Sequence, residues 1–254
     1  MNRVLFLVLC GALLLPAWAG AQGAAPTPAP TPTATTVPEE KGPPKEEIVS
    51  GGTLPDDLLG RWLVVGWIAM KDGEHGKTTT SLWDVTKEDA QVVFREVFRG
   101  MPARINDAIT AANAEDKIWK PTAEDIAELQ RDWDSLPERD PLLATQRNEL
   151  YGKDGFDRDF KNENQTKDSI WAARQTGTFR RSAAPAVKSI NVYGATEARD
   201  GGWAGNFTTA TIAAAPFPIP IKLEGKFQMY RVGGPSEAPK KGFWSSLFSG
   251  CGRK

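Results

Sequence analysis

Residues 61–70 read Arg-Trp-Leu-Val-Val-Gly-Trp-Ile-Ala-Met, and both alternating faces of this run are almost entirely apolar. A strand that is apolar on both faces is typical of a position between two packed layers. Asp72 and Gly73 then mark a turn, and further strand-like runs follow at 78–86 and 90–98. Together the three runs predict an antiparallel meander.

A second strand signal lies near the C-terminal end of the chain, where period-two alternation extends over 217–229. This pattern indicates one buried face and one solvent-facing side. The two prolines early in the run cannot donate to a ladder, so we expect the strand to begin at a sheet edge or a barrel rim. The positions expected to be buried are Phe217, Ile219, Ile221, Leu223, Gly225, Phe227 and Met229.

The middle of the chain has helical periodicity. Pro102 suits a first helical turn, and Ile105 and Ile109 follow at helical spacing. A clearer helix opens at Thr122, with Asp125 three residues later as in a capping box, and an apolar stripe extends to residue 136.

The residues that follow, 138–167, are polar, and the strand signal resumes at 169–180, 188–197 and 203–213. We therefore expect a mainly β (α+β) domain over 49–232. Its core would be an antiparallel barrel or strongly bent sheet of about seven or eight strands, with a helical insertion near 101–137 after the third strand. Closure is favoured because long exposed edges invite pairing with other molecules.

The start of the first strand resembles the opening of the lipocalins, a calycin-type family of β-barrels. Gly60-Arg61-Trp62 matches the Gly-x-Trp with which that family begins its first strand, and Arg231 lies near the end of the last expected strand. The resemblance implies that Trp62 closes the barrel floor and that Arg231 packs across it. It also implies an interior able to hold a small apolar ligand.

The first residues carry an export signal. Arg3 precedes an apolar run of about 12 residues, and small residues at Ala17, Ala19 and Ala21 fit cleavage after either of the last two. Because that run is too short to span a bilayer, we expect residues 1–21 to be a cleaved signal peptide. The protein would then be periplasmic or extracellular, and the composition indicates a bacterial source.

Residues 22–48 form a Pro/Thr-rich segment with almost no apolar bulk, which predicts a disordered linker. It is either a stalk that holds the domain away from a surface or an inert leader.

The C-terminal residues 233–254 predict a flexible tail that is basic and aromatic. Such a segment either contacts a membrane surface or a protein partner, or folds back on the domain. The positions expected to make those contacts are Phe243, Trp244, Leu247, Phe248 and Cys251, of which the last is the only cysteine left after signal cleavage.

Composition excludes several function classes. The 31 Lys and Arg residues balance 32 Asp and Glu residues, which leaves no basic excess for nucleic acid. One His and two Cys argue against a zinc site. The sequence around His75 ends like a phosphate-binding loop but lacks its first glycine, so we expect an exposed turn there. No cofactor, metal or catalytic residue is predicted.

These observations favour an exported, non-enzymatic binding module. Its ligand would be a small apolar molecule held by Ile219, Ile221, Leu223 and Phe227. One alternative is a structural or interaction protein of the bacterial envelope that acts through its linker and tail. An enzyme built on a buried carboxylate pair is a third reading, although no spacing among the acidic residues selects one.

Overall fold

The computed structural model describes residues 44–70, 75–157, 160–161, 166–179, 187–213 and 220–235. The expected signal peptide, all but the last residues of the expected linker, and the tail positions from Phe243 to Cys251 lie outside this part of the chain. The same holds for Phe217 and Ile219.

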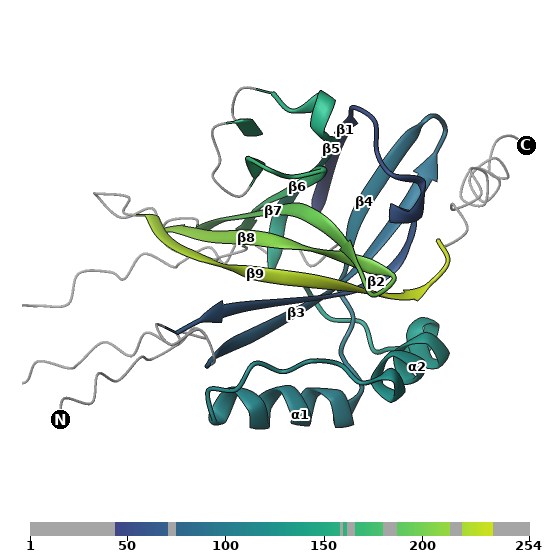
Figure 1. Ribbon diagram of the computed structural model, residues 1–254. Coiled ribbons are helices and arrows are strands. Elements are labelled where there is room, and N and C mark those ends of the chain that lie inside the picture. The colour runs from purple at the N-terminus through teal and green to yellow at the C-terminus, as the bar shows by residue number, and fades with distance from the viewer. Residues whose placement is uncertain are drawn as a thin grey trace, which may run out of the picture. The chain divides into compact units, whose positions relative to one another are not determined.

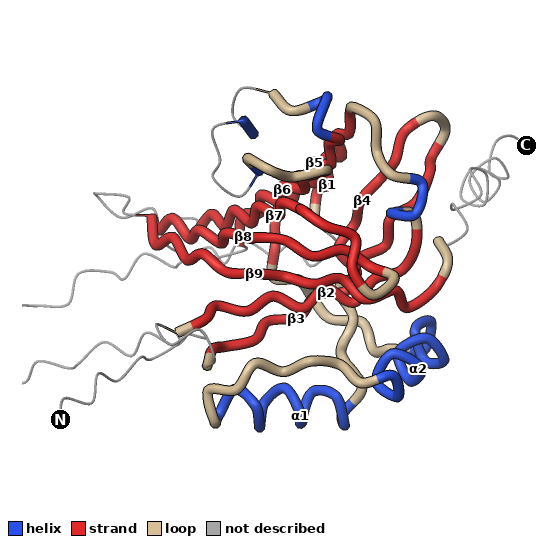
Figure 2. Tube along the Cα trace, viewed as in Figure 1, coloured by secondary structure: helices blue, strands red, loops and turns tan. Residues whose placement is uncertain are grey.

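The described chain forms a mainly β domain with one nine-stranded sheet that curls into a nearly closed barrel (Figures 1 and 2). The spatial order is β1-β5-β6-β7-β8-β9-β2-β3-β4. The strands are β1 (Lys45–Gly51), β2 (Gly60–Ala69), β3 (Gly76–Glu88), β4 (Gln91–Val97), β5 (Leu143–Gly152), β6 (Trp171–Phe179), β7 (Val187–Arg199), β8 (Gly202–Ala213) and β9 (Pro220–Gly233).

The expected strand count was too low, because β1 and β5 were not predicted. Both strands are polar: β1 reads Lys-Glu-Glu-Ile-Val-Ser-Gly and lies partly in the expected linker, while β5 lies in the polar stretch 138–167. They also pair in parallel, from Lys45 opposite Thr145 to Gly51 opposite Tyr151, so the barrel is not wholly antiparallel. The other neighbouring strands pair antiparallel, as expected.

Side chains bridge the two edges of the sheet, β1 and β4. Arg95 on β4 donates from Nε to Glu46 Oε2 on β1 at 3.0 Å, and Asn148 Nδ2 on β5 donates to Glu46 Oε1 at 2.9 Å. Arg95 also holds Glu88. The barrel is thus completed by charge pairs rather than by a ninth ladder.

The two faces of β2 are buried by different layers, as its sequence predicted. Trp62 and Val64 point into the barrel. Leu63 and Val65 point outward, where they belong to a second cluster with Leu129 and other side chains from the helical insertion.

That insertion follows β4 and consists of α1 (Ala103–Ala114) and α2 (Ala123–Asp132), which lie together on one side of the sheet (Figure 1). The expected capping box is present: Thr122 Oγ1 accepts from the Asp125 backbone N–H, and the Asp125 carboxylate accepts from the Thr122 N–H. No helix among the described residues is long and apolar enough to cross a membrane.

Candidate functional site

One end of the barrel interior is filled by buried aromatic side chains, which include Trp62, Trp171, Trp203 and Phe227 and form the floor of the barrel. Trp62 is fully buried, and its Nε1 donates to the Leu58 carbonyl at 2.8 Å. The Arg231 guanidinium lies 4.3 Å from the centroid of the Trp62 ring and donates to the carbonyls of Leu59, at 2.8 Å, and Asp57. Trp62 and Arg231 are also directly opposite in the β2–β9 ladder.

Gly60 belongs to the same arrangement. Its φ of +150° is one that residues with a Cβ rarely adopt, and a Cβ there would lie 2.6 Å from Arg231 Nη1. The structure therefore brings together the three positions on which the lipocalin resemblance rests.

Three of the residues proposed to hold a ligand are described, and none of the three lines the cavity or the pockets reported below. Ile221 and Leu223 are 64% and 46% exposed, although the alternation predicted that both are buried. They lie in the first part of β9, which projects with β8 beyond the closed part of the barrel (Figure 1), so no opposite wall covers them. Phe227 is buried in the aromatic core instead, and Ile219 lies outside the described residues.

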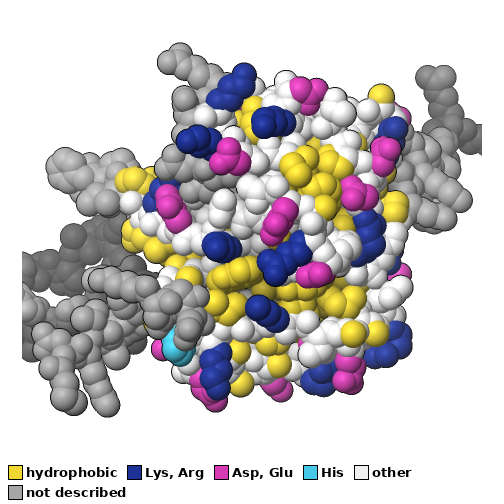
Figure 3. Space-filling view, in the orientation of Figure 1, with side chains coloured by type: hydrophobic (Ala, Val, Ile, Leu, Met, Phe, Trp, Pro, Cys, Tyr) yellow, Lys and Arg dark blue, Asp and Glu magenta, His cyan; other side chains and the backbone are white. Residues whose placement is uncertain are grey.

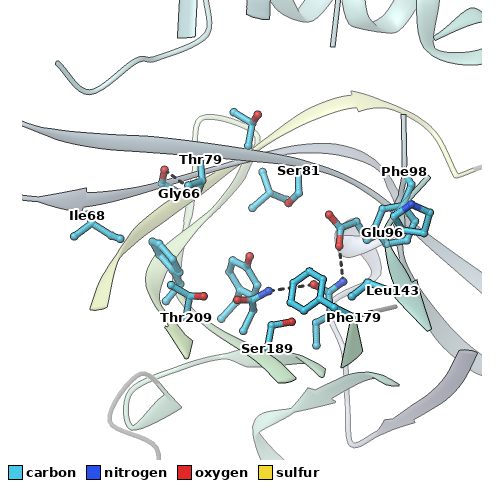
Figure 4. Close-up of a pocket in the computed structure, with 17 residues that line it drawn as sticks. Gly66, Ile68, Thr79, Ser81, Glu96, Phe98, Leu143, Phe179, Ser189 and Thr209 are labelled. Carbon is cyan, nitrogen blue, oxygen red and sulfur yellow. Dashed lines mark hydrogen bonds between the residues drawn. The ribbon is translucent and has the colours of Figure 1, made fainter. Parts of the chain in front are cut away.

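The interior does contain a cavity of about 330 Å³, farther along β2 from the floor (Figure 4). Seven strands or their ends contribute to it. Most of the side chains that line the cavity form a polar set and an apolar set. The polar set is Thr79, Ser81, Glu96, Gln175, Ser189, Asn191 and Thr209; the apolar set is Val64, Ile68, Phe98, Leu143, Phe179, Tyr193 and Phe207.

A directed chain of hydrogen bonds crosses the polar side of this cavity. Gln175 Nε2 on β6 donates to Glu96 Oε2 on β4 at 2.7 Å, and Asn191 Nδ2 on β7 donates to Gln175 Oε1 at 3.2 Å. Figure 4 shows Glu96 and Ser81 on one side of the cavity and Ser189 and Thr209 on the other. The two amides thereby orient the carboxylate of Glu96.

Burial changes the acidity of the groups at this site. Desolvation raises the pKa of Glu96 above 4.5, although the Gln175 hydrogen bond and the charge of Arg139 act in the opposite direction. Desolvation and the neighbouring Glu96 also raise the pKa of the Tyr193 hydroxyl. The ring of Tyr193 stacks on Phe207 with centroids 5.8 Å apart, so the aromatic wall adjoins the carboxylate.

Two other hollows are present among the described residues. A pocket of about 250 Å³ adjoins the cavity, shares Glu96 and Ser81 with it, and adds Arg99, Arg139 and Asp140. The third, of about 570 Å³, lies at Trp67, Lys120 and Lys226, among other residues. Figure 3 shows the face of the molecule that carries β9 and the helices, where a band of hydrophobic side chains is bordered by Lys and Arg.

The acidic loop after β5 has a structural role in the part that the structure describes. Asp154 accepts from the Thr53 backbone N–H at 2.7 Å and from its hydroxyl at 2.8 Å, which fastens the end of β1 to the end of β5. His75 is exposed and pairs by backbone with Lys117. The described residues contain no group of three His, Cys, Asp or Glu side chains able to hold a metal ion.

Sequence reasoning did not find Glu96, Gln175 or Asn191. A signal for Glu96 was present: in the run 90–98 it shares its face with the apolar Val92 and Phe94, so it is the one charged residue on that buried face. Gln175 and Asn191 lie in strands of mixed polarity and stand out only through their contacts.

No family model matches the chain, and no curated protein or solved structure matches it significantly.

Proposed function

We propose that this protein is an exported, non-enzymatic binding module that holds a small molecule with an apolar body in the open part of its barrel. The observation that carries the proposal is the 330 Å³ cavity inside the sheet, with an apolar wall on one side and an ordered polar chain on the other. Export rests on the sequence of residues 1–21 alone.

The size and lining of the cavity support binding. Ligand sites commonly occupy about 300–1,000 Å³, lie in the mouths of β-barrels and combine apolar walls with a few polar groups. The walls come from strands held by continuous ladders from β5 to β4, so the cavity is preformed. A preformed site avoids part of the ordering cost of association.

The same lining gives less support to catalysis. Glu96 is the single carboxylate among the described residues that line the cavity, whereas hydrolytic acid–base chemistry commonly uses a converging pair. The envelope-interaction alternative depends on the linker and tail, of which the structure describes only residues 44–48 and 233–235, and no contact of the described chain favours it.

The test is to titrate the purified full chain with N-phenyl-1-naphthylamine, an uncharged probe whose fluorescence rises in apolar sites. Ser189→Phe places a ring inside the cavity, and we expect it to weaken binding by about tenfold, or about 1.4 kcal/mol. Lys188→Phe is the matched control, because Lys188 is the preceding residue of β7, exposed, and absent from the lining.

Equal binding by both variants would place the probe elsewhere and contradict the proposal. Failure of the wild-type chain to bind the probe, or any displacing alcohol or amine of similar size, would contradict it as well.

A further inference from the structure

The lining of the cavity is asymmetric in charge. Of its described side chains only Glu96 carries a formal charge, and no Lys or Arg lines the cavity. The carboxylate is partly buried, and it is held by Gln175, which is itself only 8% exposed. A carboxylate in such surroundings is costly unless a positive group or several donors compensate it.

The direction of the hydrogen-bond chain decides what the cavity offers to a ligand. Gln175 donates its NH₂ group to Glu96, and Asn191 donates its NH₂ group to Gln175. The chain therefore ends at Asn191, whose carbonyl oxygen Oδ1 takes no part in it. Within the described part of the chain, neither Glu96 Oε1 nor Asn191 Oδ1 has a hydrogen-bond partner. Both are acceptors, and a ligand that donates would satisfy them.

We propose that the cavity selects an organic cation, a primary alkylamine with an apolar body, and that Glu96 is its counter-ion. This inference rests on the proposed binding function and names its ligand class. The ammonium group has three donors and no acceptor, which suits the carboxylate of Glu96 and the hydroxyl of Ser81 on the same side of the cavity.

The aromatic wall adds a second attraction for a cation. Tyr193 and Phe207 both line the cavity, and their rings stack on each other. A cation within about 6 Å of such a ring is attracted to it, more so where water is excluded. The same wall would contact the alkyl body, for which the cavity has room equal to about eleven waters at about 30 Å³ each.

Other charged and titratable groups around Glu96 modulate this preference. Tyr193 faces it from β7 with a hydroxyl that stays protonated at neutral pH. Arg139 acts on Glu96 from the adjoining pocket, which also contains Arg99 and Asp140. Because Arg139 lines that pocket and not the cavity, its charge stabilises the carboxylate without occupying the ligand's place.

The experiment compares three probes that share one alkyl chain, octylamine, octanol and octanoate, by calorimetry on the full chain at pH 7. We expect octylamine to bind at least tenfold more tightly than octanol, and octanoate to bind most weakly. Glu96→Gln should remove the amine preference, and a far-ultraviolet circular dichroism spectrum equal to that of the wild-type chain shows that the variant is folded. Glu138→Gln is the control, since it removes the same charge at an exposed residue outside the cavity.

A second measurement needs no variant. An alkylammonium keeps its proton across the acidic range, so the amine preference of the wild-type chain should fall as pH is lowered through the raised pKa of Glu96.

The outcomes separate the two proposals. Equal or tighter binding of octanol or octanoate would overturn the amine proposal and leave the binding function standing. An amine preference that survives in Glu96→Gln, or that is insensitive to acid, would also overturn it. Absence of binding by all three probes would remove both.

Discussion

The contact between Trp62 and Arg231 can be tested as a pair. Trp62→Ala removes a fully buried ring, and a buried Trp covers about 150–250 Å², which at about 25 cal/mol per Å² amounts to about 4–6 kcal/mol. Truncations of buried aromatic residues cost about 3–5 kcal/mol. We therefore expect a loss near 4 kcal/mol in the free energy of unfolding, a large share of the total for a typical domain.

Arg231→Ala should cost no more than this, about 1.5–4 kcal/mol. The residue is solvent-exposed, so its attraction to the Trp62 ring contributes about 0.5–1 kcal/mol. The rest comes from its donations to the carbonyls of Leu59 and Asp57, at about 0.5–1.5 kcal/mol each. Those carbonyls do not belong to the tryptophan, so only the ring contact should appear as coupling between the two mutations.

The assay is urea unfolding of both single variants and the double variant. Unfolding is monitored by far-ultraviolet circular dichroism, because replacing Trp62 changes the tryptophan fluorescence itself. We expect a coupling energy of about 0.5–1 kcal/mol. A control cycle pairs Trp62 with the exposed Lys188 and should be additive. Additivity of Trp62 and Arg231 within about 0.3 kcal/mol would refute the contact as an energetic feature of the floor.

Three further variants test other parts of the structure. Gly60→Ala should lower the free energy of unfolding by about 1–3 kcal/mol, measured by the urea midpoint, because φ is +150° there and the added Cβ displaces the guanidinium above it. Glu88 has a pKa held below 4.5, first by its hydrogen bond from Arg95, so its stabilisation is present above that value and is lost as pH falls through the folded pKa. Arg95→Met should therefore flatten the acid dependence of stability below about pH 5, in thermal melts taken as a pH series. Replacing Glu96, Gln175 and Asn191 together by Leu should leave the melting temperature unchanged or raise it while abolishing amine binding, because all three members of the hydrogen-bonded chain are removed at once.

The elements predicted correctly from the sequence are those that bury apolar side chains against an apolar layer. Residues 61–70 showed two apolar faces, and β2 lies between the barrel interior and the helices. The helix from Thr122 showed its capping box and apolar stripe, and both are present. In each case the local pattern is enough to predict the buried face, because that face packs on apolar side chains and needs no specific partner residue.

The missed strands, β1 and β5, are buried by polar contacts and not by an apolar layer. In β5, Glu149 is buried because Arg174 on β6 holds both of its oxygens, and Asn148 is buried beside Glu46 on β1. Such partners are separated by 25 to 102 positions along the chain. The local sequence of such a polar strand therefore has the pattern of a linker or a loop.

The error at the ligand residues has a different cause. Alternation in 217–229 predicts which residues share a face, and Phe227 and Met229 are indeed buried. It does not predict how far along the strand the opposite wall extends, so Ile221 and Leu223 share the inner face but are exposed. Burial at a barrel mouth is set by the lengths of the other strands, which a single segment does not encode.

The two ends of the interior thus differ in chemistry. The floor consists of buried aromatic side chains, namely Trp62, Trp171, Trp203 and Phe227. Trp171 meets both Trp203 and Phe227 edge to face, and the contribution of such packing to stability accounts for these residues. Around the cavity, three strands each contribute a polar side chain to one chain that ends on a carboxylate. Apolar residues of similar volume would fill that space at lower cost in free energy. A carboxylate kept there at the expense of stability is the pattern of a functional site, and this is why we propose Glu96, rather than the apolar wall, as the residue that sets the specificity of the barrel.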